Sequence, residues 1–262
     1  GSIPLVGGHG TSGSFGPLLE ETYGVSGALT VALAAATYGL VSGSMMGGPI
    51  ARRRVEKLGL KSTAAQEGNA SDDKGGIIDS QKFTNAAVFL AIAIGAGTLI
   101  MTGFSKLNIT MPGYIGAMLF AALLRNIWDA KGADLPMEEI DTLGGLSLNI
   151  YLAMAMMNLK LWQLAALALP MIVILLVQTV IMFLYANFVI FNVMGRDYEA
   201  AAMTSAFCGF GMGATPNAMA NMKALAERYG AAPRAFFIVP LVGSLFIDFF
   251  NSMVLTTFMN LL

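Results

Sequence analysis

Long stretches without a charged side chain are the feature of this sequence that most restricts how it can fold. A helix needs about 20 mostly apolar residues to cross a bilayer, and several uncharged windows reach that length. Only 12% of the 262 residues are charged, whereas a soluble domain has roughly 25%. The sequence therefore predicts an all-α polytopic membrane protein. It excludes a soluble enzyme, and a net charge of −1 gives no basic footprint for nucleic acid.

Six membrane-spanning helices are predicted around these windows. They cover residues 25–50, 83–105, 111–128, 141–159, 162–194 and 235–260. Cytoplasmic loops hold an excess of lysine and arginine. If the first span ends in the cytoplasm, that side receives 13 of the 15 basic residues, and only Lys106 and Lys160 lie on the other side. This split supports both the number of spans and their orientation. Residues 51–82 are polar and are predicted to be a cytoplasmic linker.

The uncharged segment 200–222 is long enough to cross the membrane, but we predict that it does not. Four helix-breaking residues interrupt its middle, namely Gly209, Gly211, Gly213 and Pro216. The arms on either side, at 199–208 and 217–228, are each long enough to reach about half-way through a bilayer. We therefore predict a re-entrant hairpin over residues 199–228.

The first 24 residues repeat this plan. Gly7–Thr11 is a glycine-rich break followed by threonine, and both short arms end in an E-x-Y-G pattern, at 21–24 and 227–230. Five predicted spans separate the two breaks, and an odd number places them on opposite faces of the membrane. We therefore predict a second re-entrant hairpin over residues 1–24, of opposite orientation. Residues 1–50 would end a first repeat, and residues 83–262 would form a second, inverted repeat.

Inverted repeats with broken helices are typical of secondary transporters, whose binding sites lie where the breaks meet. A half-helix N-terminus offers N–H groups and a positive dipole end to an anion. Two other functions stay open. Re-entrant loops also build the filters of passive channels, and Gly10–Gly13 matches a G-x-S-G protease pattern with His9 as its only available base. Close packing of helices at glycine is a third, purely structural explanation of the breaks.

Several segments resemble motifs of the glutamate:sodium symporter family of bacteria. These segments are residues 7–11, 47–52, 213–222, 240–243 and 246–251. The resemblance implies a transporter of the bacterial cytoplasmic membrane that takes up glutamate with sodium by alternating access. It also implies two inverted five-span domains, sodium as coupling ion and no cofactor. Nothing in the chain resembles the first four spans of the family, so we expect them to be missing from it. A homodimer stays open.

Polar groups beside the two breaks form the candidate substrate site. The hydroxyls and amides there suit a carboxylate or an amine, although Thr215 and Asn217 would also serve as helix caps. We expect His9 to be a hydrogen-bonding strut rather than a proton relay. The candidate substrate-binding residues are Gly8, His9, Gly10, Thr11, Ser12, Gly213, Thr215, Asn217 and Asn221.

The candidate sodium site centres on Asp248, the only acidic residue within a predicted span core. A carboxylate at that depth is costly unless it is paired or hydrated. Asn251 lies three residues on and shares its helix face. Unwound backbone carbonyls complete the set, and we assign them to Gly211 and Ala214. The alternative is a protonated Asp248 that makes a hydrogen bond between helices. No lysine or arginine lies deep in a predicted span, so a cotransported cation would help to balance an anionic substrate.

Overall fold

The structure, a computed structural model, describes residues 2–62, 79–107, 114–132, 134–157 and 161–261. Every regular element in these ranges is helical, which confirms the prediction of an all-α protein. The helices form two compact units. One comprises residues 1–73 and 160–255, and the other comprises residues 74–159 and 256–262. The candidate site residues lie in the first unit.

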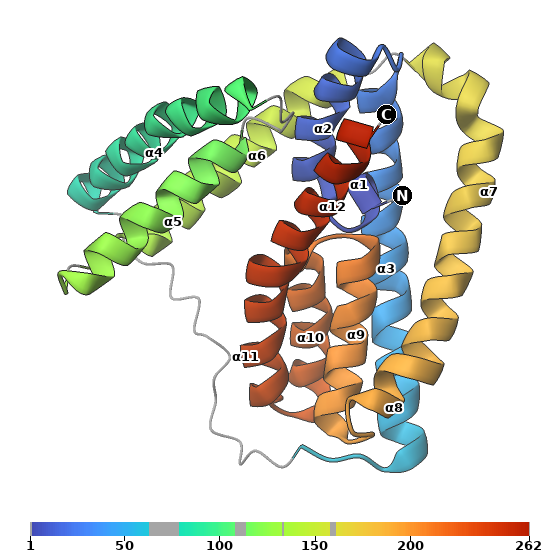
Figure 1. Ribbon diagram of the computed structural model, residues 1–262. Coiled ribbons are helices and arrows are strands. Elements are labelled where there is room, and N and C mark those ends of the chain that lie inside the picture. The colour runs from blue at the N-terminus through green and yellow to red at the C-terminus, as the bar shows by residue number, and fades with distance from the viewer. Residues whose placement is uncertain (1, 63–78, 108–113, 133, 158–160, 262) are drawn as a thin grey trace. The chain divides into compact units, whose positions relative to one another are not determined.

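The first unit is built from both ends of the chain (Figure 1). Its N-terminal helices are α1 (Ser2–Leu5), α2 (Gly8–Tyr23) and α3 (Ala28–Leu58). The second segment begins with α7 (Leu161–Tyr185), which continues through a π-helical stretch (Ala186–Ile190) into α8 (Phe191–Val193). It then forms α9 (Tyr198–Met212), α10 (Thr215–Tyr229) and α11 (Pro233–Leu241). A second π-helical stretch (Val242–Ile247) leads into α12 (Asp248–Leu261), whose last residues are grouped with the other unit.

The second unit consists mainly of α4 (Ser80–Lys106), α5 (Tyr114–Ala130) and α6 (Met137–Met157). Asp79 caps α4 by accepting a hydrogen bond from the Gln81 backbone N–H at 2.9 Å. The Phe89 ring of α4 meets the Trp128 ring of α5 edge to face, with 5.8 Å between their centroids. Such a contact adds to the apolar area that holds two helices together.

Among the described residues, three helices are long and apolar enough to cross a membrane. They are Ala28–Leu58, Ser80–Lys106 and Ala168–Val193, and they match the spans predicted at 25–50, 83–105 and 162–194. Large apolar side chains on these helices face outward, as Leu99 and Leu169 do with about three quarters of their surface exposed. In water such surface would be unfavourable, so it indicates a membrane protein. The other three spans and the re-entrant hairpins stay predictions.

Helix α3 continues eight residues past the predicted end of its span at residue 50. Arg52 and Glu56 form an ion pair one helical turn apart, and Val55 is buried. Gly59 then ends the helix in a left-handed conformation with φ of 60°, as C-terminal glycines commonly do. The predicted linker thus begins with helix, and most of its remainder, residues 63–78, lies outside the described residues.

The interruption predicted between α9 and α10 is shorter than we expected. Gly209 and Gly211 are helical, and α9 reaches Met212, so the prediction that they break the helix is wrong. A Cβ on Gly209 would lie 2.6 Å from the Ala218 backbone N. Glycine at this position therefore lets the two arms approach closely within a regular helix. Only Gly213 and Ala214 separate the arms, and Pro216 stands in the first turn of α10, where its missing N–H costs nothing.

Candidate functional site

The two glycine breaks meet in space. Gly8, the first residue of α2, adopts φ of 61°, a conformation that side chains strongly disfavour. A Cβ added to Gly8 would lie 2.7 Å from the Gly213 carbonyl oxygen and 3.2 Å from the Ala214 Cβ. Glycine at position 8 is therefore required both by the backbone conformation and by the neighbouring chain.

Two helices begin at this contact, and neither has a side-chain cap. Gly7 precedes α2 and Ala214 precedes α10, and neither N-terminus receives a side-chain hydrogen bond. The capping role considered for Thr215 and Asn217 is therefore wrong. From the contact, α2 and α10 run toward opposite ends of the unit (Figure 1). The first N–H groups of a helix lack partners within it and carry its positive dipole end. In the first turn of α10, Pro216 has no N–H and the Asn217 N–H donates to the Ala214 carbonyl oxygen at 3.0 Å. An anion at this contact could therefore bind the first N–H groups of α2 and the Thr215 N–H of α10.

A stripe of glycines on α3 positions the α9–α10 hairpin. A Cβ on Gly39 would lie 2.0 Å from the Met212 carbonyl oxygen, and one on Gly47 would lie 2.8 Å from that of Ser205. A Cβ on Gly43, between them, would lie 2.9 Å from the Cys208 carbonyl oxygen. Sequence analysis missed this stripe. Its signal was the four-residue spacing, which lets helices pack closely in membranes.

Asn217 and Asn221 cross the same interface. Their side-chain amides donate to backbone carbonyl oxygens of α3, from Asn217 to Leu40 and from Asn221 to Gly43, each at 3.2 Å. Asn221 also donates to the Ser205 carbonyl at 3.2 Å, and the Ser44 hydroxyl donates to the Asn217 side-chain oxygen. Both asparagines are buried. Their side chains therefore join α10 to α3, whatever further contacts they make with a substrate.

The first break is held by side chains of its own helix and of α3. The His9 Nε2 atom lies 3.0 Å from the Thr37 hydroxyl oxygen in a hydrogen bond, which is the strut that we predicted. The Ser12 hydroxyl donates to the carbonyl oxygens of Gly8 at 2.7 Å and Ala32 at 3.3 Å. Because Ser12 is fully buried in these contacts, it braces the start of α2 against α3.

Part of the predicted site remains accessible. Gly10 is exposed, and four of the other candidates are half-buried, namely His9, Thr11, Ala214 and Thr215. Gly211 is also half-buried, and a Cβ there would lie 2.1 Å from the Met182 methyl group of α7. Asn251 is half-buried in α12. The side chain of Asp248 lies outside the described part of the structure.

An acidic clamp holds the opposite end of the α9–α10 hairpin. The Glu199 carboxylate, 6% exposed, accepts backbone hydrogen bonds from Arg234 at 3.3 Å and Ala235 at 2.8 Å. It thereby caps the first turn of α11. Asp197 caps α9 through the Ala200 N–H at 2.7 Å and lies 3.8 Å from the Arg234 guanidinium. Sequence analysis missed this clamp, since nothing local indicated that residue 199 contacts residue 235.

A second polar contact joins the ends of α3 and α10 beyond the apolar part of α3. The Tyr229 hydroxyl donates to the Glu56 carboxylate at 2.7 Å, and Arg52 donates to the same oxygen at 2.9 Å. These two bonds join the ends of α3 and α10 through one carboxylate oxygen.

Comparisons with known proteins give both a family match and named relatives. The family model described as Sodium/glutamate symporter matches residues 1–231. The Sodium/glutamate symporter of Escherichia coli K12 is 40% identical over 272 residues, which include all of this chain and 67% of the relative. The one from Haemophilus influenzae is 34% identical over 265 residues, with coverage of 97% and 65%.

The chain spans about two thirds of the length of these curated relatives. No solved structure matches it. The relatives are named as symporters, and the family is one of transporters rather than enzymes. A family match over most of the chain, together with relatives aligned along its whole length, shows that this chain belongs to the sodium/glutamate symporter family.

Proposed function

We propose that this protein is a secondary active transporter that couples the uptake of glutamate to sodium by alternating access in the bacterial cytoplasmic membrane. The observation that carries the proposal is the contact between Gly8 and Gly213, where two uncapped helix N-termini meet. The names of its relatives supply the substrate and the ion.

Glutamate suits this arrangement because it has two carboxylates and the contact has two helix N-termini. We assign one carboxylate to the first turn of α2 and the other to the Thr215 N–H at the start of α10, since Pro216 has no N–H and that of Asn217 donates to Ala214. The half-buried side chains of His9, Thr11 and Thr215 stand beside these turns and supply neutral donors. N–H groups at a helix N-terminus bind carboxylates and phosphates without any lysine or arginine.

Sodium would bind close to the same break. Sodium prefers hard oxygen ligands, and we assign these to Asp248, Asn251 and two backbone carbonyls. The carbonyls are that of Gly211, in the last turn of α9 rather than in an unwound segment, and that of Ala214, which also accepts the Asn217 and Ala218 N–H groups. A sodium ion so placed would offset the single net negative charge of glutamate. Bound sodium would then raise the affinity for glutamate, and bound glutamate would raise the affinity for sodium by the same factor, which is the basis of coupling.

Alternating access rests on the proposed inverted repeats. We propose that residues 1–24 and 199–228 are re-entrant hairpins that enter the membrane from opposite faces, among six spans. The opposite directions of α2 and α10 from their contact support this arrangement (Figure 1). Substrate held between the two breaks would then be reachable from either side in turn.

Proteoliposomes test the proposal against a channel. The purified protein, with an inward sodium gradient, should accumulate labelled L-glutamate above its equilibrium level. A sodium ionophore should abolish the accumulation, and an equal gradient of choline should not drive it. Glutamate entry that never exceeds equilibrium, or that is equal in sodium and choline, would instead favour a passive channel.

A further inference from the structure

The last turns of α3 carry a concentration of positive charge. Arg52, Arg53, Arg54 and Lys57 lie within six positions. Two of them are engaged. Arg52 pairs with Glu56 at 2.9 Å, and the Arg54 guanidinium donates to the Asn187 carbonyl at 2.7 Å and lies 4.7 Å from the centroid of the Phe191 ring.

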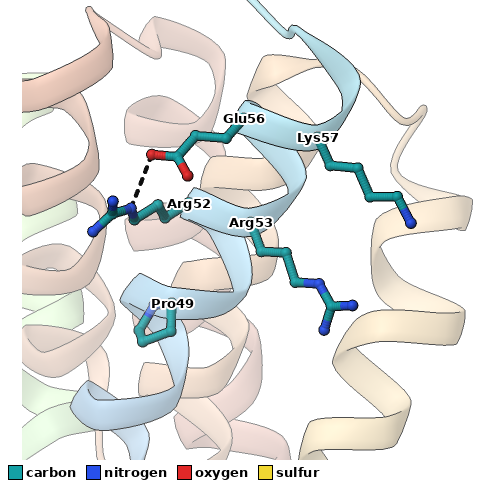
Figure 2. A pocket seen from close by; sticks show the side chains of 5 residues that line it. All are labelled: Pro49, Arg52, Arg53, Glu56 and Lys57. Carbon is teal, nitrogen blue, oxygen red and sulfur yellow. Dashed lines mark hydrogen bonds and ion pairs between the residues drawn. The ribbon is translucent and has the colours of Figure 1, made fainter.

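The other two basic side chains have no compensating partner in the described ranges. Arg53 and Lys57 are exposed and form no ion pair or hydrogen bond with any described residue. They stand one helical turn apart and point away from Arg52 and Glu56 (Figure 2). Together with Pro49, these four residues line an open hollow of about 570 Å³. Two uncompensated positive charges therefore border an accessible surface.

An exposed apolar row leads to these charges. Val41 and Met45 are 56% and 71% exposed, and Pro49 is also exposed. Each is four residues from the next, and the same spacing continues to Arg53 and Lys57, so the five side chains follow one ridge of α3. Along this ridge the surface changes from apolar, where acyl chains contact a membrane protein, to cationic.

We propose that this ridge of α3 binds an anionic phospholipid, whose phosphodiester lies between Arg53 and Lys57 and whose acyl chain follows Met45 and Val41. The planar guanidinium donates two parallel hydrogen bonds to a phosphate, and the ammonium adds a second charge. Compensation of the dipole at the helix end would need a cation only in the last turn, where Lys57 stands. Compensation of the dipole therefore does not explain why a second exposed cation, Arg53, stands one turn before Lys57.

Competition between lipids tests this site without any transport measurement. The purified protein is exchanged into nanodiscs or detergent with phosphatidylglycerol and phosphatidylcholine of equal acyl composition, and retained lipid is counted by native mass spectrometry. The wild type should retain phosphatidylglycerol preferentially. A basic side chain beside an anionic lipid changes affinity about fivefold, so the preference for phosphatidylglycerol should fall about 25-fold in the Arg53→Gln/Lys57→Gln variant.

Two matched variants control for charge and folding. Lys131→Gln/Lys223→Gln removes the same charge at exposed positions elsewhere and should retain phosphatidylglycerol as the wild type does. Arg53→Lys/Lys57→Arg keeps both charges and should also retain it. Equal retention of the two lipids by the wild type would overturn the proposal, as would normal retention by the double glutamine variant. Displacement of the lipid by millimolar glycerol phosphate would also overturn it, because the site would then bind a soluble anion.

Discussion

Gly8 packs against the carbonyl oxygen of Gly213, so that two breaks from opposite ends of the chain touch. Each break exposes backbone that a bilayer would leave without partners. Contacts with α3 supply partners for this backbone. The glycines of α3 let the α9–α10 hairpin pack closely, and the Asn217 and Asn221 amides donate to carbonyl oxygens of α3. Helix α3 is therefore the element that keeps both breaks in place, and two of the predictions below test its contacts.

A methyl group at position 8 should separate the breaks. Gly8→Ala would put a side chain on a residue with a left-handed backbone, and its Cβ would lie 2.7 Å from the Gly213 carbonyl oxygen. We expect a loss of about 2–4 kcal/mol of stability. Thermal unfolding in detergent measures it. Gly10→Ala is the control, since a Cβ there meets nothing within 4 Å. Equal melting temperatures for the two variants would contradict the described contact.

The glycine stripe makes a similar prediction for two adjacent residues. In Gly47→Ala the new Cβ would lie 2.4 Å from the Asn221 side-chain nitrogen and 2.8 Å from the Ser205 carbonyl oxygen, so we expect a loss of about 1–3 kcal/mol. Gly48→Ala meets nothing within 4 Å and should stabilise the helix by up to about 1 kcal/mol. Thermal-shift measurements on both proteins should give changes of opposite sign.

The sequence predicts where the two breaks lie better than it predicts which residues contact each other. The breaks near Gly8 and Gly213 were predictable, because glycine acts on its own backbone. Gly209 and Gly211 were misread for the same reason. A glycine that permits close packing is identical in sequence to one that breaks a helix, and only the facing chain, here Ala218 and Met182, distinguishes them.

The same limit applies to the polar residues. Asn217 and Asn221 were predicted to lie on one helix face, which is a local property. Their acceptors, the Leu40 and Gly43 carbonyls, belong to a helix more than 170 residues earlier, and no spacing rule reaches that far. Glu199, which caps α11, was missed for this reason too.

The role of Asn221 can be separated into structure and binding. Asn221→Asp places a carboxylate against the Gly43 and Ser205 carbonyl oxygens, which the amide now contacts as a donor. We expect a loss of at least about 2 kcal/mol, because buried acceptors then face each other. Asn126→Asp makes the same chemical change at an exposed amide and should cost far less. Unchanged stability of Asn221→Asp with a raised KM for glutamate would assign this side chain to the substrate alone.

The Glu199 clamp should depend on its charge. Glu199→Gln keeps one acceptor for the backbone N–H groups of Arg234 and Ala235 but removes the negative charge from the start of α11. We expect a loss of about 1–2 kcal/mol, the value of a partly buried charge at a helix N-terminus. Glu227→Gln on exposed α10 surface should be neutral. Equal thermal stability of the two variants would show that the carboxylate contributes no more than an amide.

The proposed sodium site makes the last prediction, which concerns transport rather than stability. A neutral amide in Asp248→Asn should bind the cation less well. We expect the sodium concentration for half-maximal glutamate uptake to rise tenfold or more, because loss of a charged ligand costs about 1.5–3 kcal/mol. Proteoliposome uptake measured over a series of sodium concentrations gives this value. Asp129→Asn, at an exposed position near the end of α5, is the matched control. If Asp248→Asn responds to sodium as Asp129→Asn does, Asp248 is not a sodium ligand, and the coupling ion must rely on neutral oxygens such as the Gly211 and Ala214 carbonyls.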